Sequence, residues 1–487
     1  MSEILVVGAG PTGTAAALAY AKKGARVRLV EGRPAASQRF AGEWLHPPGV
    51  RALQYLGVDS SVLGPLRGDG IVLMAPGEEP VEMPYARGFG VARVHHELVE
   101  ILREQAASHP LIEYLPHHSL RSLDGNLAGV YCSKTASKKE WKADRIIGAD
   151  GRNSNTRSAL GLSRDGVAIS YMMGIDLHGC RMPFEGQGHV IAGGPGPGLF
   201  YRVGDDIIRG CLDVPQEFGA AARKKDAVYR AFAPVLPPEW RSAFKDSLQR
   251  TTPWAGTRYQ ARQFFGLGST WLAGDAVGHV HPITGMGMTL GILDAVASAE
   301  ASTLQEYRVA RQSHVVELLT NLLYHVFQRT DESARRIRGG LLAMLRENQA
   351  ERLRTMNILT GEDERSLSFA SSFLRASRHT LEGSMKFGLQ AVLESPRSGG
   401  MMAASHLKTD IGWLKWPLGA ILGDNESEST ISSSKIFRDP LSEVSSRSSF
   451  GSLRTPSNIL LGFGSLVTSR ISSTAGGKTQ QNPVANG

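Results

Sequence analysis

Residues 4–13 read Ile-Leu-Val-Val-Gly-Ala-Gly-Pro-Thr-Gly, an apolar strand that runs into the glycine pattern G-x-G-x-x-G. Residues 14–23 predict a helix that Gly24 stops, and residues 26–30 predict a second strand. Glycines in such a turn allow a tight bend, let backbone NH groups reach a pyrophosphate and let the helix pack closely on the sheet. The stretch therefore predicts a dinucleotide-binding βαβ unit. Its cofactor-binding candidates are Gly8, Gly10, Pro11, Thr12 and Gly13.

An acidic residue follows the second strand of this unit. Glu31 lies 18 residues beyond Gly13, where a carboxylate can accept hydrogen bonds from ribose hydroxyls. This carboxylate favours a ribose without a 2′-phosphate, so FAD or NAD fits better than NADP. We assign Gly32 and Arg33, which follow it, to the same site.

Two later segments narrow the cofactor to FAD. Residues 143–154 and 271–276 predict strands that end in Asp-Gly and Gly-Asp, and residues 281–289 predict a glycine-rich helix start. A carboxylate after a strand can bind a ribityl or ribose hydroxyl, and a helix start places partial positive charge beside the flavin pyrimidine ring. Each segment alone fits an ordinary turn, but the three motifs in this order predict an FAD site. The candidates are Asp150, Gly151, Gly274, Asp275, Pro282, Gly285, Gly287 and Met288.

The order of the patterns predicts an α/β fold. We expect a Rossmann-type, glutathione reductase-like parallel sheet within an FAD-binding domain over residues 1–300. Alternating residues predict an inserted antiparallel substrate-binding sheet at about 62–92 and 165–258. A C-terminal helical region follows over 301–423, and the Ser-rich composition of 424–487 predicts a disordered tail.

Composition excludes several other classes of protein. The net charge is +8, but the basic residues are scattered among acidic ones, so we expect no nucleic-acid binding. The three cysteines form no CxxC pair, and we expect no metal site. The paired histidines at 95–96 and 117–118 are expected at the surface or in turns. No run of 18 apolar residues occurs, so we expect a cytoplasmic protein without a signal peptide or membrane span.

Several stretches resemble one group of flavoproteins. The order of the three motifs resembles the flavoprotein aromatic hydroxylases. Residues 39–49, Arg-Phe-Ala-Gly-Glu-Trp-Leu-His-Pro-Pro-Gly, resemble the squalene epoxidase pattern Arg-x-x-Gly-Glu-x-Leu-Gln-Pro-Gly-Gly. Residues 275–294 resemble that family's Asp-Ala-Phe-x-x-x-His-Pro-Leu-Thr-Gly-Gly-Gly-Met-Thr stretch, residues 81–85 its Ile-Pro-Tyr, and residues 93–96 its Arg-x-Phe-His-His turn. The resemblance covers about residues 1–345.

The resemblance also implies roles for single side chains. Tyr85 matches a tyrosine that lies over the flavin, and His46 stands where the family has a glutamine that hydrogen-bonds this tyrosine. Histidine can still donate or accept, but it is bulkier and can titrate. Tyr85 and His46 are therefore the catalytic candidates, although Tyr85 could simply pack in the core. Arg39, Glu43 and Arg93 are implied at the cofactor.

The implied function is an FAD-dependent monooxygenase that inserts one atom of O2 into an apolar substrate, most simply by epoxidation of an isoprenoid or polyene alkene. NAD(P)H would be the ultimate electron donor, either directly or through a flavoprotein reductase. Hydroxylation of an aromatic or quinolone-type ring, reduction of a prenyl chain and flavin binding without catalysis are the alternatives. Halogenation is disfavoured because the sequence lacks a Trp-x-Trp-x-Ile-Pro motif.

One segment suggests contact with a membrane surface. Residues 401–422 combine two tryptophans and several aliphatic side chains with Lys408 and Lys415. Such a mixture suits the interface of an anionic bilayer, and peripheral membrane contact is the expectation. The alternative is that the same apolar side chains close the substrate tunnel.

Overall fold

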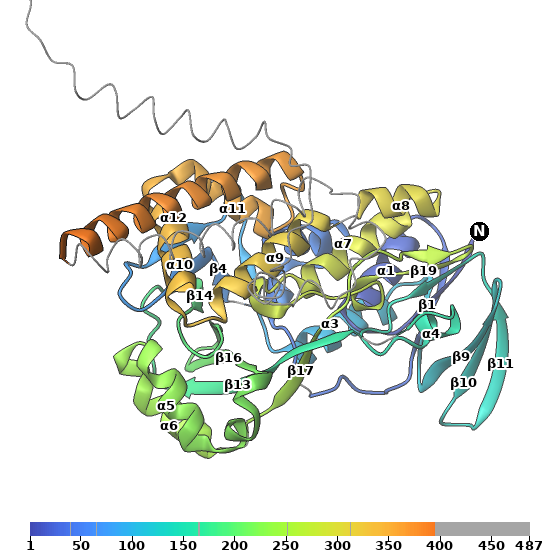
Figure 1. Ribbon diagram of the computed structural model, residues 1–487. Helices are drawn as coiled ribbons and strands as arrows, with labels where there is room; N and C mark the ends of the chain where they lie inside the picture. Colours follow the sequence, from blue (N-terminus) through green and yellow to red (C-terminus); the bar gives the residue numbers. More distant parts are fainter. Residues whose placement is uncertain (39, 65, 164–165, 251, 312, 395–487) are drawn as a thin grey trace, which may run out of the picture. The chain divides into compact units, whose positions relative to one another are not determined.

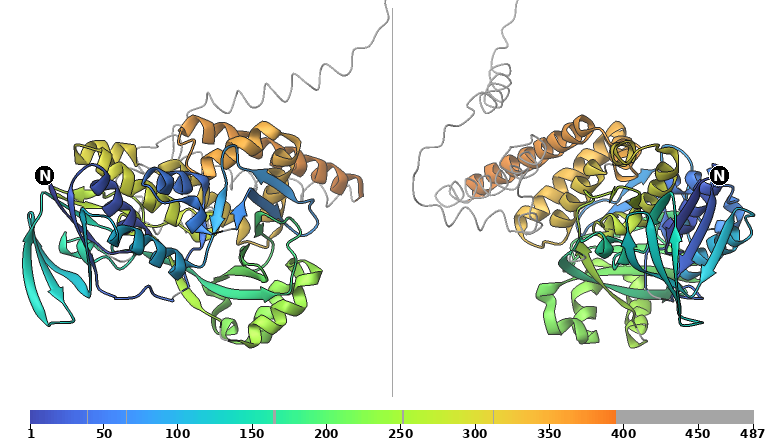
Figure 2. Two further views of the ribbon diagram at one scale, coloured as in Figure 1. Left: turned by 180° about the vertical axis from the view of Figure 1, so that it is seen from behind. Right: turned by 90° about the vertical axis from the view of Figure 1, so that its right-hand side faces the viewer.

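The computed structural model describes residues 1–38, 40–64, 66–163, 166–250, 252–311 and 313–394 (Figures 1 and 2). The chain divides into two units, Met1–Arg438 and Asp439–Gly487, and all described residues belong to the first. Arg39, the stretch 401–422 and the Ser-rich segment 424–487 lie outside the described residues, so the predictions made for them concern sequence alone.

A six-stranded sheet carries the dinucleotide-binding unit. Its strand order is β18-β19-β12-β1-β2-β8, and every pair is parallel except β18 with β19. The carboxyl ends of its parallel strands therefore meet at one edge, where the predicted motifs converge. The strands are β1 (Glu3–Val7), β2 (Arg26–Glu31), β8 (Ile112–Pro116), β12 (Arg145–Gly148), β18 (Gly266–Leu267) and β19 (Thr270–Leu272).

Alternating side chains of β1 separate the two faces of this sheet. Ile4 and Val6 join a core with the helices, whereas Leu5 and Val7 join a core with a small antiparallel sheet. The helices of this unit are α1 (Pro11–Lys22), α2 (Pro47–Tyr55), α3 (His95–Ala107), α4 (Asn155–Ala159), α7 (Gly287–Glu300) and α8 (Leu304–Ala310). The small sheet contains β9 (His118–Asp124), β10 (Leu127–Cys132) and β11 (Ser137–Lys142).

The inserted sheet has seven strands in the order β17-β13-β16-β15-β14-β5-β6. It was predicted to be antiparallel, but β5 and β14 run parallel because they come from separate insertions; the other pairs are antiparallel. Its strands are β5 (Gly70–Met74), β6 (Val81–Pro84), β13 (Val167–His178), β14 (Gln187–Ile191), β15 (Gly198–Gly204), β16 (Ile207–Pro215) and β17 (Trp254–Tyr259). A three-stranded sheet contains β3 (Trp44–Leu45), β7 (Gly90–Ala92) and β4 (Arg67–Gly68); β3 and β4 precede β5 in the chain, and β7 follows β6.

Two groups of helices pack against the inserted sheet. Helices α5 (Lys225–Phe232) and α6 (Arg241–Gln249) bury Phe232 and Phe244 with β13 and β16, and they appear in green beside β13 in Figure 1. The C-terminal helices share a second core with β5 and β6. They are α9 (His314–Phe327), α10 (Glu332–Glu347), α11 (Gln349–Leu359) and α12 (Ser366–Glu394).

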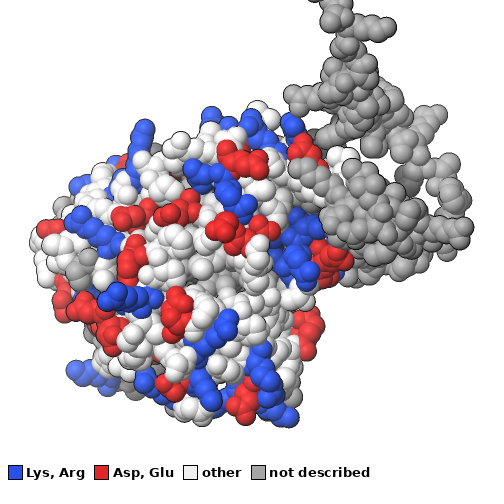
Figure 3. All heavy atoms as spheres, turned by 90° about the vertical axis from the view of Figure 1, so that its left-hand side faces the viewer, with Lys and Arg blue, Asp and Glu red and all other residues white. Residues whose placement is uncertain are grey.

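This arrangement confirms the predicted fold class, a parallel α/β sheet with additional antiparallel sheets and C-terminal helices. Among the described residues, no helix has the length and apolarity that a membrane span requires. Figure 3 shows acidic and basic side chains interspersed over one face of the molecule, as the scattered charge of the sequence predicts.

Candidate active site

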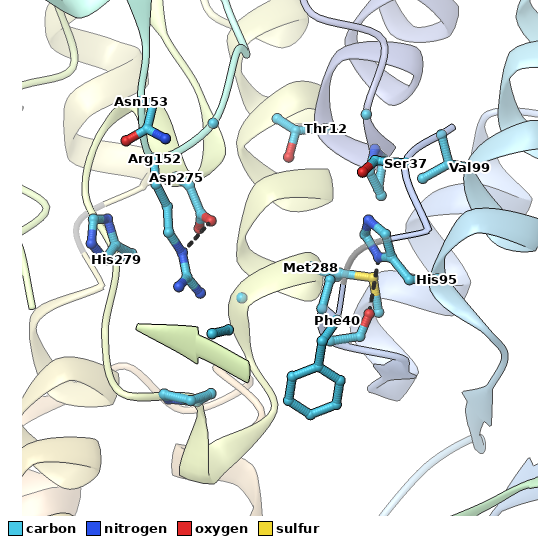
Figure 4. A pocket seen from close by; sticks show the side chains of 18 of the residues that line it. Thr12, Ser37, Phe40, His95, Val99, Arg152, Asn153, Asp275, His279 and Met288 are labelled. Carbon is cyan, nitrogen blue, oxygen red and sulfur yellow. Dashed lines mark hydrogen bonds and ion pairs between the residues drawn. The ribbon is translucent and has the colours of Figure 1, made fainter. Parts of the chain in front are cut away.

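A cavity of about 1160 Å3 opens at the carboxyl ends of the parallel strands and continues to the inserted sheet. Four sequence motifs and the inserted sheet supply its walls; Figure 4 shows part of them. The predicted residues that line it are Gly8, Gly10, Pro11, Thr12, Glu31, Gly32, Arg33, Glu43, Asp150, Gly151, Asp275, Pro282, Gly285, Gly287 and Met288. The inserted sheet adds Met172, Leu199, Tyr201, Cys211, Asp213 and Trp254.

The glycine turn leaves space where a pyrophosphate would bind. A Cβ on Gly13 would lie 1.7 Å from the carbonyl oxygen of Gly8, so the turn tolerates no side chain there. A Cβ on Gly10, in contrast, would meet no atom within 4 Å. Helix α1 begins beside this space with no side-chain cap, which leaves backbone NH groups for an anion. The turn therefore fits the diphosphate of FAD, with Gly13 packed behind the cavity surface.

Two backbone amides and one guanidinium hold the Glu31 carboxylate at the end of β2. Its Oε2 accepts a hydrogen bond from the Ala9 amide at 2.9 Å, and its Oε1 accepts one from the Arg33 amide at 3.0 Å. The Arg103 guanidinium lies 3.4 Å from Oε2. The carboxylate is thus fixed at the cavity wall, in a position that fits a ribose.

The two later acidic residues differ in how much of the carboxylate remains accessible. Asp150 accepts from Ser154 and Thr156 at the start of α4, so both of its oxygens already have partners. Asp275 pairs with Arg152 at 3.2 Å and keeps 32% of its side chain exposed to the cavity. Burial favours the neutral acid, but the charge of Arg152 opposes it and helps to lower the pKa of Asp275. Asp275 is therefore the acid better placed to accept a cofactor hydroxyl.

The turn before α7 exposes an uncapped helix start to the cavity. A 3-10 turn, η6 (Pro282–Thr284), ends at Gly285, whose φ of 65° lies in the left-handed region that favours glycine. Helix α7 begins at Gly287 without a side-chain cap, and a Cβ there would meet no atom within 4 Å. Partial positive charge and open space are what a flavin pyrimidine ring requires. Gly274 lies behind this surface, packed against Thr12.

A chain of hydrogen bonds between side chains fixes the position of this turn. His46 is buried, and burial lowers its pKa to about 4, so the ring is neutral. Its Nε2 lies 2.8 Å from the Thr284 carbonyl oxygen, which can only accept, so Nε2 carries the proton. Nδ1 then accepts from the Tyr85 hydroxyl at 2.8 Å, and that hydroxyl accepts from Trp44 Nε1 at 2.9 Å. The implied contact between Tyr85 and His46 is present; Trp44 and Thr284 were not identified from the sequence.

Tyr85 and His46 form this chain without lining the cavity surface, where Trp44 and Gly285 lie instead. Burial raises the pKa of Tyr85, so its hydroxyl stays protonated. Both side chains are therefore placed to fix the position of cavity-lining groups.

The arginine and glutamate implied at the cofactor have other partners. Arg93 donates to the Val62 carbonyl at 3.1 Å, pairs with Glu97 at 3.2 Å and is not among the residues that line the cavity. Glu43 is 3% exposed and pairs with Arg209 of β16 at 2.9 Å. Burial raises the pKa of Glu43 to about 7 against the opposing charge of Arg209. Glu43 thus joins residues 40–43, the loop before β3 (here the cofactor loop), to the inserted sheet.

Sequence reasoning missed a second buried pair in the cavity wall. His281 Nδ1 accepts from the Ile283 amide at 3.2 Å, so Nε2 carries the proton and donates to Asp213 Oδ1 at 3.0 Å. Ser170 of β13 donates to the same oxygen. Tyr324 of α9 stacks on the His281 ring with centroids 3.9 Å apart. The only signal in the sequence was the position of His281 within the motif at 281–289.

Two histidines expected at the surface or in turns lie instead at the cavity. His95 is buried and its Nδ1 pairs with the Gly42 carbonyl at 3.0 Å, and His118 also lines the wall. That expectation was wrong for His95, which begins α3 at the carboxyl edge of the sheet, whereas His118 is half-buried and directly follows the turn residue His117. Within the described part of the chain, no group of three histidine, cysteine or acidic residues could hold a metal ion.

The comparisons with known proteins agree with this geometry. The family model for an FAD binding domain matches residues 1–304. Squalene epoxidase 2, mitochondrial, of Arabidopsis thaliana is 29% identical over 69% of this chain, and the chain spans 62% of that relative's length. Squalene monooxygenase SE2 of Panax ginseng is 30% identical over 68% of this chain and 67% of the relative.

A solved structure supports the fold alone. The p-nitrophenol 4-monooxygenase PnpA of Pseudomonas putida DLL-E4 is 20% identical, with a TM-score of 0.62 over 75% of this chain and 98% of that chain. The matched family model gives FAD as the cofactor, and the glycine turn and acidic residues that line the cavity fit it. The chain therefore belongs to the squalene epoxidase-like family of FAD-dependent monooxygenases.

Proposed function

We propose that this protein epoxidises a carbon–carbon double bond in an apolar isoprenoid or polyene. The reaction consumes O2, two electrons and two protons, places one oxygen atom in the epoxide and leaves the other as water. NAD(P)H is the ultimate source of the electrons, and a flavoprotein reductase is the partner that delivers them. Direct reduction by NAD(P)H is the alternative route.

The main support for the proposal is that one cavity extends from the predicted FAD-binding residues to an apolar wall. That wall includes Phe40, Met172, Leu199 and Trp254, which come from the cofactor loop and the inserted sheet. An apolar surface of this kind binds a hydrocarbon chain and keeps water away from the reacting atoms. Bound FAD would supply the activation of O2.

The protein's own residues have binding and positioning roles in this proposal. Glu31 and Asp275 bind hydroxyls of the cofactor, and the backbone amides at the starts of α1 and α7 face its charged and electron-rich parts. His46 and Tyr85 fix the turn Pro282–Thr284 through the Thr284 carbonyl. Arg39, Arg93 and Glu43 remain proposed contributors to the order of the cofactor loop.

Hydroxylation of an aromatic or quinolone-type ring is the second candidate. Ring hydroxylation is helped by a base that accepts a proton from a phenol or amine. The buried Asp213–His281 pair lies in the cavity wall and could accept such a proton. Reduction of a prenyl chain is a third possibility, since it requires the same FAD site but no O2.

Single-turnover experiments separate these candidates. The flavin of the holoenzyme is reduced chemically without O2, mixed with a linear isoprenoid polyene or with a phenol, and then exposed to O2. We expect the polyene to yield epoxide with little hydrogen peroxide, whereas the phenol should leave O2 reduced to peroxide. Oxygenation of the phenol alone would favour ring hydroxylation, and saturation of the polyene before O2 is added would favour a reductase.

A further inference from the structure

Arg262 is a buried arginine beside the turn that presents Asp275 to the cavity. It lies between β17 and β18 in the chain, and only 4% of the residue is exposed. Its Nη1 donates to the Gly274 carbonyl at 3.1 Å and to the Gly278 carbonyl at 3.3 Å. These two carbonyls lie on either side of Asp275, which belongs to the 3-10 turn η5 (Gly274–Ala276). One guanidinium nitrogen therefore spans the segment from which Asp275 extends.

The other two guanidinium nitrogens fix the orientation of the Arg262 side chain. Nε donates to the Ser313 hydroxyl at 3.0 Å, and Nη2 pairs with Asp294 of α7 at 2.6 Å. Asp294 is fully buried, and its Oδ2 also accepts from the Gly274 amide at 2.8 Å. The pair of Arg262 and Asp294 thus holds both the carbonyl and the amide of Gly274. Because all three nitrogens have partners in the protein, Arg262 can act on a ligand through the segment that it holds.

Electrostatic interactions favour the same arrangement. Burial opposes the charge of Arg262, but the charge of Asp294 raises the pKa of Arg262, so the guanidinium stays protonated. Burial likewise acts to raise the pKa of Asp275, whereas the charge of Arg152 and, after it, that of Arg262 lower it. Arg262 therefore favours the ionised form of Asp275, which accepts hydrogen bonds from hydroxyl groups.

We propose that Arg262 is a positioning residue that orients the Asp275 carboxylate towards a hydroxyl of the FAD ribityl chain. Arg262 holds the backbone on both sides of Asp275, whose side chain keeps 32% of its surface exposed. Through Asp294 it also ties this turn to α7, whose uncapped start lines the same cavity. The proposal rests on FAD as the cofactor and on Asp275 as the acid that binds its hydroxyl. It does not depend on which substrate is oxidised.

The test measures the affinity of the apoprotein for FAD and for ADP, which has neither the ribityl chain nor the flavin ring. Arg262→Lys keeps the charge but cannot span both carbonyls, so it should weaken FAD binding roughly 3- to 10-fold and leave ADP binding unchanged. Asp275→Ala removes a charged hydrogen bond and should weaken FAD binding roughly 10- to 100-fold. Because Arg262 acts through Asp275, the double variant should bind FAD as Asp275→Ala does.

Arg145 provides a matched control for the loss of a guanidinium. It also donates to two backbone carbonyls, those of Ser298 and Ala301, at 3.1 and 3.2 Å, but it is not among the residues that line the cavity. Arg145→Lys should therefore lower the melting temperature of the apoprotein and leave the affinities for FAD and ADP unchanged.

Three results would overturn the proposal. They are losses of FAD affinity that multiply in the double variant, equal losses of FAD and ADP affinity in Arg262→Lys, and wild-type FAD affinity in either single variant. Since no substrate is present, these results are independent of the proposed epoxidation.

If Arg262→Lys does not fold, Ser313→Ala applies the same test. It removes the acceptor of Nε and leaves the pair with Asp294 in place. FAD affinity should fall about threefold, again without a change for ADP and without a further loss in Asp275→Ala. Unchanged FAD affinity in Ser313→Ala would then contradict the proposal.

Discussion

The hydrogen-bond chain through Tyr85 and His46 links Trp44 to the Thr284 carbonyl, two separate parts of the cavity wall. Replacing Tyr85 by Phe leaves both Trp44 Nε1 and His46 Nδ1 without their partner. We expect the variant to retain FAD but to release hydrogen peroxide in place of part of the product, because the turn that faces the flavin is less well fixed. The measurement is the ratio of product formed to reductant consumed.

A matched control is available on the surface. Tyr55 is 46% exposed, donates to Glu300 at 2.9 Å and is not among the residues that line the cavity, so Tyr55→Phe removes one tyrosine hydroxyl outside it. Tyr55→Phe should form as much product per reductant consumed as wild type does. If Tyr85→Phe and Tyr55→Phe form the same amount of product per reductant consumed, Tyr85 is only a packing residue.

His46 makes the stability of the protein depend on pH. Its folded-state pKa of about 4 lies below the value of about 6.5 expected in the unfolded chain. The unfolded state therefore binds more protons between these values, and stability falls as the pH drops from 6.5 towards 4, by up to about 3 kcal/mol for this group. His46→Gln should show a shallower loss of melting temperature over that range. His189 and His279 have the same shift, so the slope should shrink without vanishing.

At the scale of elements, the turn between β1 and α1 distinguishes two glycines. Gly13→Ala would force a Cβ into the Gly8 carbonyl and should disrupt the turn, lowering the stability of the apoprotein. Gly10→Ala has room in the protein alone, but its methyl group would enter the space that we propose for the diphosphate. We expect it to fold with wild-type stability and to lose FAD affinity. Circular dichroism melts and FAD titrations measure the two effects, and a stable Gly13→Ala with full FAD affinity would contradict this account.

Elements with local signals could be predicted from the sequence. The βαβ unit and the two later motifs are short patterns in which glycines and acids have fixed spacing, and their order predicted the parallel sheet and the FAD site. The parallel pairing of β5 with β14 could not be predicted, because it depends on tertiary packing of distant segments. The pairs Asp213–His281 and Glu43–Arg209 were missed for the same reason, since 68 and 166 residues separate their members.

At the scale of the whole molecule, an apolar substrate must be taken from lipid. The segment 401–422 lies outside the described residues, and we propose from its composition that it binds the surface of an anionic membrane. Wild type should float with anionic liposomes, high salt should weaken this, and Trp413→Ala combined with Trp416→Ala should abolish it. Flotation by that double variant, or wild type that stays in solution, would contradict this proposal.

We propose that FAD in this cavity directs one atom of O2 to an apolar alkene. The most direct test supplies the holoenzyme with a flavoprotein reductase, NADPH, a linear isoprenoid polyene and isotopically labelled O2, and analyses the products by mass spectrometry. We predict an epoxide that carries one labelled oxygen atom and keeps every hydrogen of the substrate. A product that has gained hydrogen without oxygen, or label that appears only in hydrogen peroxide, would contradict the claim.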